Sequence, residues 1–201
     1  LADPAGQLLG HVFKVASDPF VGKLCYIRVH SGTLKGDVQP RVCDGKKGIR
    51  LGHLLEPQGR DTADIDAAVP GDIVCVAKVD DLHYDSTLHL ADGGWACLKS
   101  VPLPKPMYGL AIETTTKGAE SKLGDAITRM RAEDPTFTLE RVATTSEQII
   151  RGLGELHLRS KLQLLKDQYG IEVDTRQPKV AYKETIQGEA EGHHRHKKQT
   201  G

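Results

Sequence analysis

The repeated prolines Pro102, Pro104 and Pro106 limit most strongly how this chain can fold. Each proline fixes φ and lacks a backbone N–H donor, so residues 101–106 suit neither a helix interior nor a central strand. We expect an extended, stiff connector there. The hydrophobic pattern changes across this connector, which predicts two separate folding units within the 201 residues.

Residues 1–100 have the pattern of an all-β unit. Short β-prone runs alternate with turn signals rich in Gly, Pro and Asp. Asp44-Gly45 is a candidate hairpin turn between residues 38–43 and 49–55, although the following sequence also allows a longer loop. Several short strands at this spacing predict a small β-barrel. The expected strands lie at residues 8–15, 23–29, 49–55, 73–79 and 87–90.

Residues 107–178 alternate between strand-like and helical patterns. The spacing of Leu123, Ala126, Ile127 and Met130 predicts a helix, which must end near Asp134 because a proline follows. A second helix is expected to start near Gly154 and to stop at Gly170. Together with strand-like runs, they give the order βαββαβ, which predicts a ferredoxin-like α+β domain. The strand-like runs are 108–112, 137–142, 147–150 and 171–174.

Residues 179–201 have a different character from the two units before them. Residues 180–186 look like the opening strand of a further domain, and the remaining tail has few apolar side chains. Such a tail has no means of burying itself, so we expect residues 179–201 to be partly disordered.

The charge balance narrows the possible partners. Lys plus Arg (27) equals Asp plus Glu (27), so attraction to nucleic acid over the whole surface is not expected, and any RNA contact must come from local basic clusters. The aromatic content of 4% also argues against a base-stacking surface.

The cysteines and histidines give no metal or redox motif. Cys25, Cys43, Cys75 and Cys97 contain no Cys-x-x-Cys pair, and we expect reduced, mostly buried thiols. The histidines near residues 193–196 have no fixed geometry and no cysteine beside them, so no metal site is expected.

No catalytic constellation can be recognised in the sequence. The phosphate-binding Gly-x-x-x-x-Gly-Lys-Ser/Thr loop and the Gly-x-Gly-x-x-Gly fingerprint are both absent. We therefore expect this fragment to have no enzyme activity and no cofactor. No apolar run approaches the roughly 20 residues that span a membrane, and there is no signal peptide, so we expect a cytoplasmic location and no membrane partner.

Three segments nevertheless resemble one protein family in the right order. They are Asp18-Pro19-Phe20-Val21-Gly22-Lys23-Leu24, Gly152-Leu153-Gly154-Glu155-Leu156-His157-Leu158 and the terminal Lys197-Lys198-Gln199-Thr200-Gly201. All three are similar to segments of elongation factor G, the ribosomal translocase. By this resemblance, residues 1–100 correspond to the β-barrel domain II, 101–106 to a linker, 107–178 to the ferredoxin-like domain III and 179–201 to the start of domain IV.

The resemblance implies a function for a longer parent protein. It identifies the chain as a fragment of a ribosome-binding translational GTPase, whose GTP and Mg²⁺ would be held by a G domain outside these residues. The implied partners are the ribosome, through ribosomal RNA and small-subunit proteins, and the parent's own G domain and later domains. A monomer is expected.

The candidate site residues fall into three groups, each with a second interpretation. The start of the second helix is expected to face other domains or the ribosome, since in the family it faces the GTPase domain and the fusidic acid pocket. His157 could instead be a boundary histidine bonded to backbone or water. Two barrel arginines could pair with RNA phosphate or merely aid solubility, and the basic tail could face RNA or be a solvated charge run. The candidates are Gly154, Glu155, His157 and Lys161; Arg28 and Arg41; and Arg195, His196, Lys197 and Lys198.

Departures from the family pattern leave the exact role open. After Leu158 the family runs through acidic and aliphatic residues to Asp-Arg-Met-Lys, whereas this chain continues Arg159-Ser160-Lys161. These changes favour an elongation factor G-like paralogue, which would bind ribosomes without translocation, and they put fusidic acid sensitivity in doubt. A stand-alone RNA-binding module with the same βαββαβ order is the other alternative.

Overall fold

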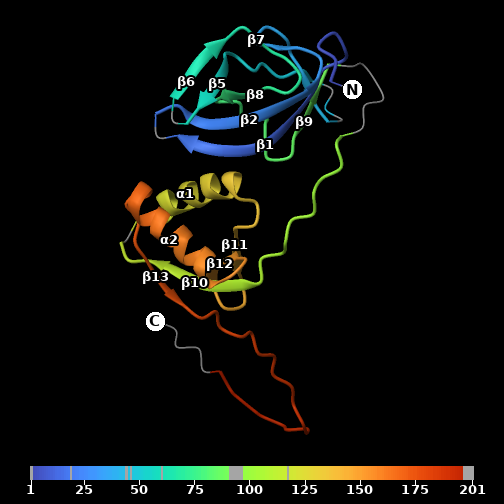
Figure 1. The fold of residues 1–201 in the computed structure, drawn as a ribbon. Helices are drawn as coiled ribbons and strands as arrows, with labels where there is room; N and C mark the ends of the chain where they lie inside the picture. The colour runs from blue at the N-terminus through green and yellow to red at the C-terminus, as the bar shows by residue number, and fades with distance from the viewer. Residues whose placement is uncertain are drawn as a thin grey trace.

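The computed structural model describes residues 2–18, 20–43, 45, 47–59, 61–90, 97–116 and 118–196. Two units are joined by an extended connector that runs along the outside of the molecule (Figure 1). The first unit is all-β and the second is α+β, as the sequence predicts. No helix in these ranges is long and apolar enough to cross a membrane.

The first unit is a β-barrel-like arrangement around one apolar core. Its main sheet has the strand order β4-β9-β1-β2-β8-β5-β6, and a small second sheet pairs β3 with β7. The register of β1 against β2 shifts between Val12 and Lys14, which marks a bulge that bends the long hairpin. The strands are β1 (Leu9–Asp18), β2 (Gly22–Ser31), β3 (Leu34–Lys35), β4 (Arg41–Val42), β5 (Leu54–Gln58), β6 (Asp61–Ile65), β7 (Ala67–Ala68), β8 (Ile73–Ala77) and β9 (Thr87–His89).

Part of the expected barrel pattern is wrong. Ile49 and Leu51 are buried in the core, yet residues 49–53 form no strand, so their apolar character reflects core packing. The ladder expected between residues 38–43 and 49–55 is reduced to one backbone hydrogen bond, from the Ile49 N–H to the Pro40 oxygen at 2.8 Å, and β4 pairs with β9 instead. Asp44 itself lies outside the described residues. The β5–β6 hairpin escaped prediction because β6 is exposed and polar, with no apolar alternation.

The second unit has the ferredoxin-like topology. Its sheet order is β11-β12-β10-β13, and all neighbouring strands are antiparallel. Apolar side chains of both helices pack with Ile112 and Ile150 of the sheet in one core, so the helices cover one face. The elements are β10 (Tyr108–Thr114), α1 (Glu120–Glu133), β11 (Thr138–Val142), β12 (Glu147–Gly152), α2 (Glu155–Tyr169) and β13 (Val173–Arg176).

Both helices end where the sequence indicates. The last residue of α1 is Glu133, and the backbone of Asp134 is extended ahead of the proline. Gly170 caps α2 in the left-handed conformation (φ 64°), and its N–H donates to Lys166 while that of Ile171 donates to Leu165. This arrangement satisfies carbonyls that a helix end otherwise leaves unpaired.

The two units meet along α1. Figure 1 shows α1 lying between the barrel and the rest of the second unit. Ala132 packs against the barrel core, and the Ser17 backbone N–H donates to Glu133 Oε1 at 2.6 Å. The connector at residues 101–107 has no helix or strand and is mostly exposed. The contact between the units is therefore made by the end of β1 and the end of α1.

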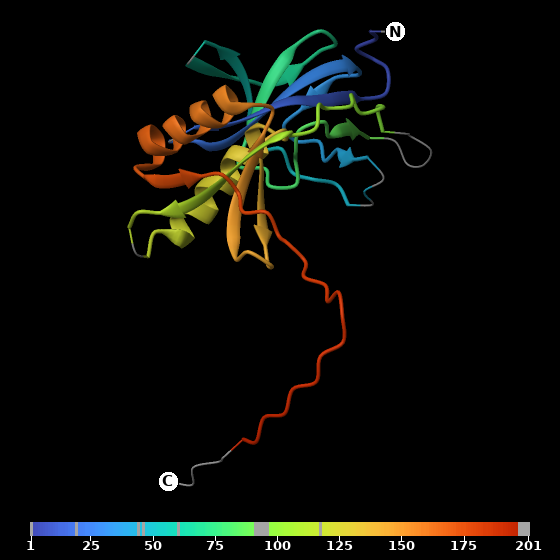
Figure 2. The ribbon, with the colours of Figure 1, turned by 90° about the horizontal axis from the view of Figure 1, so that it is seen from below.

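Beyond β13 the chain leaves the second unit as an exposed segment. Residues 177–196 form no helix or strand and extend away from both units (Figure 2). The strand expected at residues 180–186 is absent. A strand needs a neighbour to receive its hydrogen bonds, and none lies beside this segment within the described residues.

The expectation that all four cysteines are reduced thiols is wrong for two of them. Cys43 and Cys97 are joined by a disulfide, although 54 positions separate them in sequence. Their pairing depends on tertiary packing at the β4–β9 edge, which no sequence spacing signals. Cys25 and Cys75 are buried free thiols, as expected, and burial raises the pKa of Cys75 to about 11.

Candidate functional site

Asp134 organises the residues around the start of α2. Its Oδ2 is 2.8 Å from Nε2 of His157 and 2.9 Å from Nζ of Lys161. Its Oδ1 accepts hydrogen bonds from the backbone N–H and the hydroxyl of Thr136 at 3.0 and 2.6 Å. The residue that follows α1 thus joins the two helices through their polar side chains.

The hydrogen bonds of His157 define its tautomer. The Leu153 backbone N–H donates to Nδ1 at 3.1 Å, so Nδ1 must carry a lone pair. Nε2 then carries the proton and donates it to Asp134. His157 therefore fastens the turn at residues 152–154 to the end of α1, which is the backbone-bonded role that the sequence left open.

The charge state of Asp134 follows from these contacts. Burial opposes ionisation of this carboxyl group, but hydrogen bonds from Thr136 and Lys161, the charge of Lys161 and the hydrogen bond from His157 outweigh it. The pKa of Asp134 is consequently held well below its ordinary value of 3.8. Lys161 is only 15% exposed and also lies 5.9 Å from the centre of the Phe137 ring, so it is held by two neighbours.

The two glycines before α2 have different environments. A Cβ at Gly152 would lie 2.7 Å from Leu158 Cδ2 and 2.8 Å from His157 Nδ1, so this position requires a glycine. A Cβ at Gly154 would meet nothing within 4 Å, and its backbone is extended at φ −174°. Packing within the described residues does not explain the glycine at 154.

Three exposed apolar side chains, which we call the rim, lie beside this helix start. Leu153 is 46% exposed, Leu156 is 79% exposed and Met107 is 82% exposed. Met107 precedes Tyr108, which pairs with Gly152, so the three side chains gather at one end of the sheet. Sequence reasoning selected the polar residues of this region and missed these three, although a leucine on the polar side of a helix was an available signal.

Glu155 stands beside the rim in the first turn of α2. It is exposed, and its Oε1 is paired with Arg159 at 2.5 Å. Its charge suits the positive end of the helix dipole. Of the four candidates at this helix start, His157 and Lys161 thus face inward to Asp134, whereas Glu155 faces solvent.

The two barrel arginines are not neighbours. Arg28 is exposed on β2, and Arg41 is half-buried on β4, where it pairs with His89 across the ladder. Two strands, β9 and β1, separate β4 from β2, which corresponds to roughly 14 Å at the usual strand spacing. The two arginines therefore lie at separate places on the barrel.

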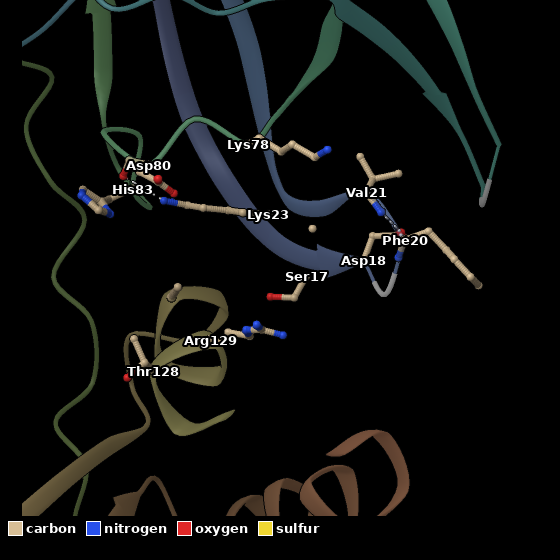
Figure 3. Close-up of a pocket in the computed structure, with 12 residues that line it drawn as sticks. Ser17, Asp18, Phe20, Val21, Lys23, Lys78, Asp80, His83, Thr128 and Arg129 are labelled. Atoms are coloured by element: carbon tan, nitrogen blue, oxygen red, sulfur yellow. Dashed lines mark hydrogen bonds between the residues drawn. The ribbon is translucent and has the colours of Figure 1, made fainter. Parts of the chain in front are cut away.

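A cavity of about 630 Å³ lies at the junction between the units (Figure 3). It is bounded by the β1–β2 turn, the segment after β8 and α1. Lysine and arginine side chains are mixed with carboxylates on its walls, so the lining has no strong charge of one sign. The lining residues include Asp18, Lys23, Lys78, Asp80 and Arg129.

The sheet face opposite the helices lacks the aromatic platform of an RNA-binding module. Phe137 is buried in the helix-side core, and Tyr108 and Tyr169 pack against that same core. On the opposite face, Arg151 is paired with Glu140 at 2.8 Å. Among the described residues of this unit, the aromatic side chains thus pack on the helix side and form no stacking platform on the opposite face of the sheet.

A buried carboxylate holds the point where the chain leaves the second unit. The side chain of Glu147 is 1% exposed, and its Oε2 accepts the Lys179 backbone N–H at 2.9 Å. Its Oε1 accepts from Arg176 Nε at 3.2 Å. The hydrogen bond from Lys179 is the main reason that the pKa of Glu147 is lowered.

The basic tail makes no contact that would define a site within the described residues. Arg195 and His196 are exposed, while Lys197 and Lys198 lie outside the described part of the chain. Among the side chains that the structure describes, no group of three or more potential ligands could hold a metal ion.

Comparisons with known proteins agree on one family for both units. The model for elongation factor G domain 2 matches residues 7–90, and the model for elongation factor G domain III matches residues 103–177. Elongation factor G of Ruegeria pomeroyi is 37% identical over 201 residues, covering 100% of this chain and 28% of its own length. Elongation factor G 1 of Synechocystis is also 37% identical, with 29% of its length covered.

A solved structure shares the fold of the chain. A crystal structure of a protein from Thermus thermophilus superposes with a TM-score of 0.77 at 34% identity, over 87% of this chain and 26% of that one. The chain thus spans less than a third of the length of the relatives it matches.

Proposed function

This chain belongs to the elongation factor G family, and from that premise we propose that its parent is a translation elongation factor that hydrolyses GTP on the ribosome. The GTP and Mg²⁺ would be bound by a G domain outside these residues. The two units described above would pass the nucleotide state of that domain to the later domains. We place the parent in the cytoplasm as a monomer.

The rim at the start of α2 is the observation that carries this proposal. Leu153 and Leu156 expose apolar side chains on a turn that His157 and Asp134 hold in place. Exposed apolar groups on a fixed scaffold favour a protein contact. The open space around Gly154 would let a partner backbone approach closely. We assign this rim to the contact with the parent's own G domain, with Glu155, His157 and Lys161 beside it.

The relay would use the junction between the units. The Ser17–Glu133 hydrogen bond and the packing of Ala132 join the barrel to α1 beside the cavity. A small, partly hollow contact of this kind can exist in two arrangements. Movement of the G domain against the rim would shift α1 on the barrel, and domain IV would move as a result. Arg28, Arg41 and the basic tail at residues 195–198 are the proposed contacts with ribosomal RNA.

The test uses the full-length parent with ribosomes and GTP. We expect ribosome-stimulated GTP hydrolysis and single-turnover movement of tRNA and mRNA. Leu156→Ser should weaken both while leaving the unfolding midpoint unchanged, because this side chain has little contact with its own domain. Val69→Ser, at an exposed apolar residue of the barrel, is the matched control and should leave both activities intact. A parent that hydrolyses no GTP with ribosomes would contradict the proposal.

The same two activity measurements distinguish a translocating parent from the paralogue alternative. Hydrolysis without tRNA movement would identify a paralogue that binds ribosomes for another purpose. Its motivation is the altered α2 surface, where Arg159 pairs with Glu155 in place of the family's acidic run. A fluorescence titration of this chain with short single-stranded RNAs tests the RNA-module alternative. Tight binding there would favour it, against the packing of Phe137, Tyr108 and Tyr169 on the helix-side core.

A further inference from the structure

We propose that Cys43 and Cys97 form a thiol–disulfide modification site that fastens the barrel end of the connector when oxidised and releases it when reduced. This inference concerns a covalent change within the chain and does not depend on the proposed function. It rests on the position of the two cysteines and on the hydrogen bonds around them.

The two cysteines are brought together by Thr87 as well as by their own bond. Thr87 lies on β9 and is 1% exposed. Its backbone oxygen accepts the Cys43 N–H at 2.9 Å, and its hydroxyl accepts the Leu98 N–H at 3.1 Å. The Cα atoms of Cys43 and Cys97 are 5.0 Å apart, within the usual range for a disulfide. After reduction the Leu98–Thr87 hydrogen bond can open and close repeatedly, and each closure brings the two thiols near enough for the disulfide to form again.

Cys43 is the fixed side of this pair. Its N–H is bonded to Thr87, and its carbonyl oxygen accepts a hydrogen bond from Nε2 of His89 at 2.6 Å. Both partners belong to β9, which lies inside the barrel sheet. The cysteine is thus anchored at both of its backbone polar groups.

Cys97 is on the movable side, at the start of the segment that leads to the connector. Residues 98–100 are exposed and belong to no helix or strand. Within the described residues, this segment also contacts the barrel through the Leu98–Thr87 hydrogen bond and one from Ser100 to the carboxylate of Asp85. Two single hydrogen bonds open far more readily than a covalent bond breaks, so the disulfide is the strongest attachment of this segment.

The chemistry is a two-electron exchange with a dithiol reductant of the thioredoxin class. A thiolate of the reductant attacks one sulfur, which breaks the Cys43–Cys97 bond and expels the other cysteine as a thiolate that takes up a proton. The second thiol of the reductant then attacks the mixed disulfide. The reductant is released with a disulfide between its own two sulfurs, and the second cysteine of the chain becomes a free thiol. Both cysteine residues are only partly buried, so a reductant can reach them.

Cys25 and Cys75 provide an internal comparison. Both are 0% exposed, and burial raises the pKa of both thiols. A protonated, buried thiol is a poor nucleophile. The redox response should therefore be confined to the Cys43–Cys97 pair.

The experiment uses the 201-residue chain before and after treatment with a dithiol reductant. Alkylation of the native protein, read by mass spectrometry, should label neither Cys43 nor Cys97 before reduction and both after it, with Cys25 and Cys75 unlabelled throughout. Hydrogen exchange at the amides of residues 98–101 should become several-fold faster on reduction, while amides of β1 and β2 keep their rates. Oxidised glutathione should restore the slow rates.

The double variant C43S/C97S is the matched control. It should exchange fast at residues 98–101 in both conditions, and the reductant should then change nothing. Free thiols at both positions after incubation with oxidised glutathione would contradict the claim that Cys43 and Cys97 form a disulfide. If the disulfide forms but its reduction leaves amide hydrogen exchange at residues 98–101 unchanged, the claim that reduction releases the connector would be wrong. Both outcomes are read on the unsubstituted chain, so the proposal stays testable if the variant fails to fold.

Discussion

Gly152 and Gly154 stand two positions apart, yet packing requires only the first of them. Gly152 lies against His157 and Leu158, whereas Gly154 has open space around the position of a side chain. The difference arises because α2 folds back over the end of β12. Glycine is therefore required by packing at position 152 but not at position 154. Substituting each one separately tests this difference.

We expect Gly152→Ala to destabilise the second unit by about 1–3 kcal/mol, because the added methyl group would push against Leu158 and the His157 ring. Gly154→Ala should change the free energy of unfolding by less than about 0.5 kcal/mol in this chain. Urea unfolding followed by circular dichroism measures both. Equal losses for the two variants would contradict the packing argument.

Asp134 gives the second unit a stability that depends on pH. Its pKa in the folded state is below the ordinary 3.8, so its contribution is present above pH 3.8 and is lost as pH falls toward the folded-state pKa. Asp134→Asn should cost about 1–3 kcal/mol at neutral pH, since an amide is a weaker acceptor for Lys161 and His157.

The check is the difference in unfolding free energy between the two proteins as a function of pH. It should be constant from neutral pH to about pH 5 and should narrow below 3.8. Asp125→Asn, at an exposed carboxylate of α1, is a control that should give a small difference at every pH. If the difference in unfolding free energy between the two proteins increased on acidification, the ionised carboxylate of Asp134 would not be the source of the stability.

At the residue scale, the sequence located the region of the candidate site better than it located the contacts. It selected His157 and Lys161 but could not show that both turn toward Asp134, because that contact joins residues 23 positions apart or more. It passed over Leu153 and Leu156, since an apolar residue in a helix is usually taken to belong to a core. Whether these residues meet another domain stays a prediction.

Elements whose stability is local were predicted well. Both helices of the second unit end within a residue of the expected positions, and α2 also begins where expected, because periodicity, proline and glycine act over a few neighbours. The strands of the barrel were predicted less well. The short strands β3, β4 and β7 depend on distant partners, and the exposed β6 has no apolar pattern.

Glu147 on β12 accepts hydrogen bonds from Arg176 on β13 and from the backbone of Lys179 in the tail. Losing its carboxylate should therefore loosen the place where the chain leaves the second unit. In Glu147→Gln the amide oxygen can accept from only one of its two present donors, Arg176 and Lys179. We expect the Lys179 amide to exchange several-fold faster with solvent and the end of β13 to fray. Glu113→Gln is the matched control, because Glu113 pairs with the same arginine from an exposed position. Unchanged exchange at Lys179 in the Glu147 variant would contradict this role.

At the scale of the whole molecule, the connector and the α1 junction are two separate links between the same units. The connector is exposed from residue 101 to 105, so it can act on the second unit only through its own stiffness. The junction acts through direct contact between Ser17 and Glu133. The relay we propose needs both links.

Replacing Pro104 and Pro106 by glycine in the full-length parent should therefore slow ribosome-dependent translocation, while GTP binding is retained. Glycine removes the restriction on φ, and a flexible connector transmits less rotation. Lys105→Ala, in the same segment, keeps the prolines and should have little effect. If the double variant translocated as fast as the unsubstituted parent, the connector would be a passive tether.

The βαββαβ order, the helix ends and the family could all be predicted without the structure, because each depends on neighbours in the chain or on motifs in a fixed order. Four features could be seen only in the folded chain: the pairing of β4 with β9, the Cys43–Cys97 bond, the inward turn of His157 and Lys161, and the burial of Glu147. The physical reason is range. Steric and periodic effects act within a few residues, whereas a buried charge or a disulfide needs a partner that only packing can bring near.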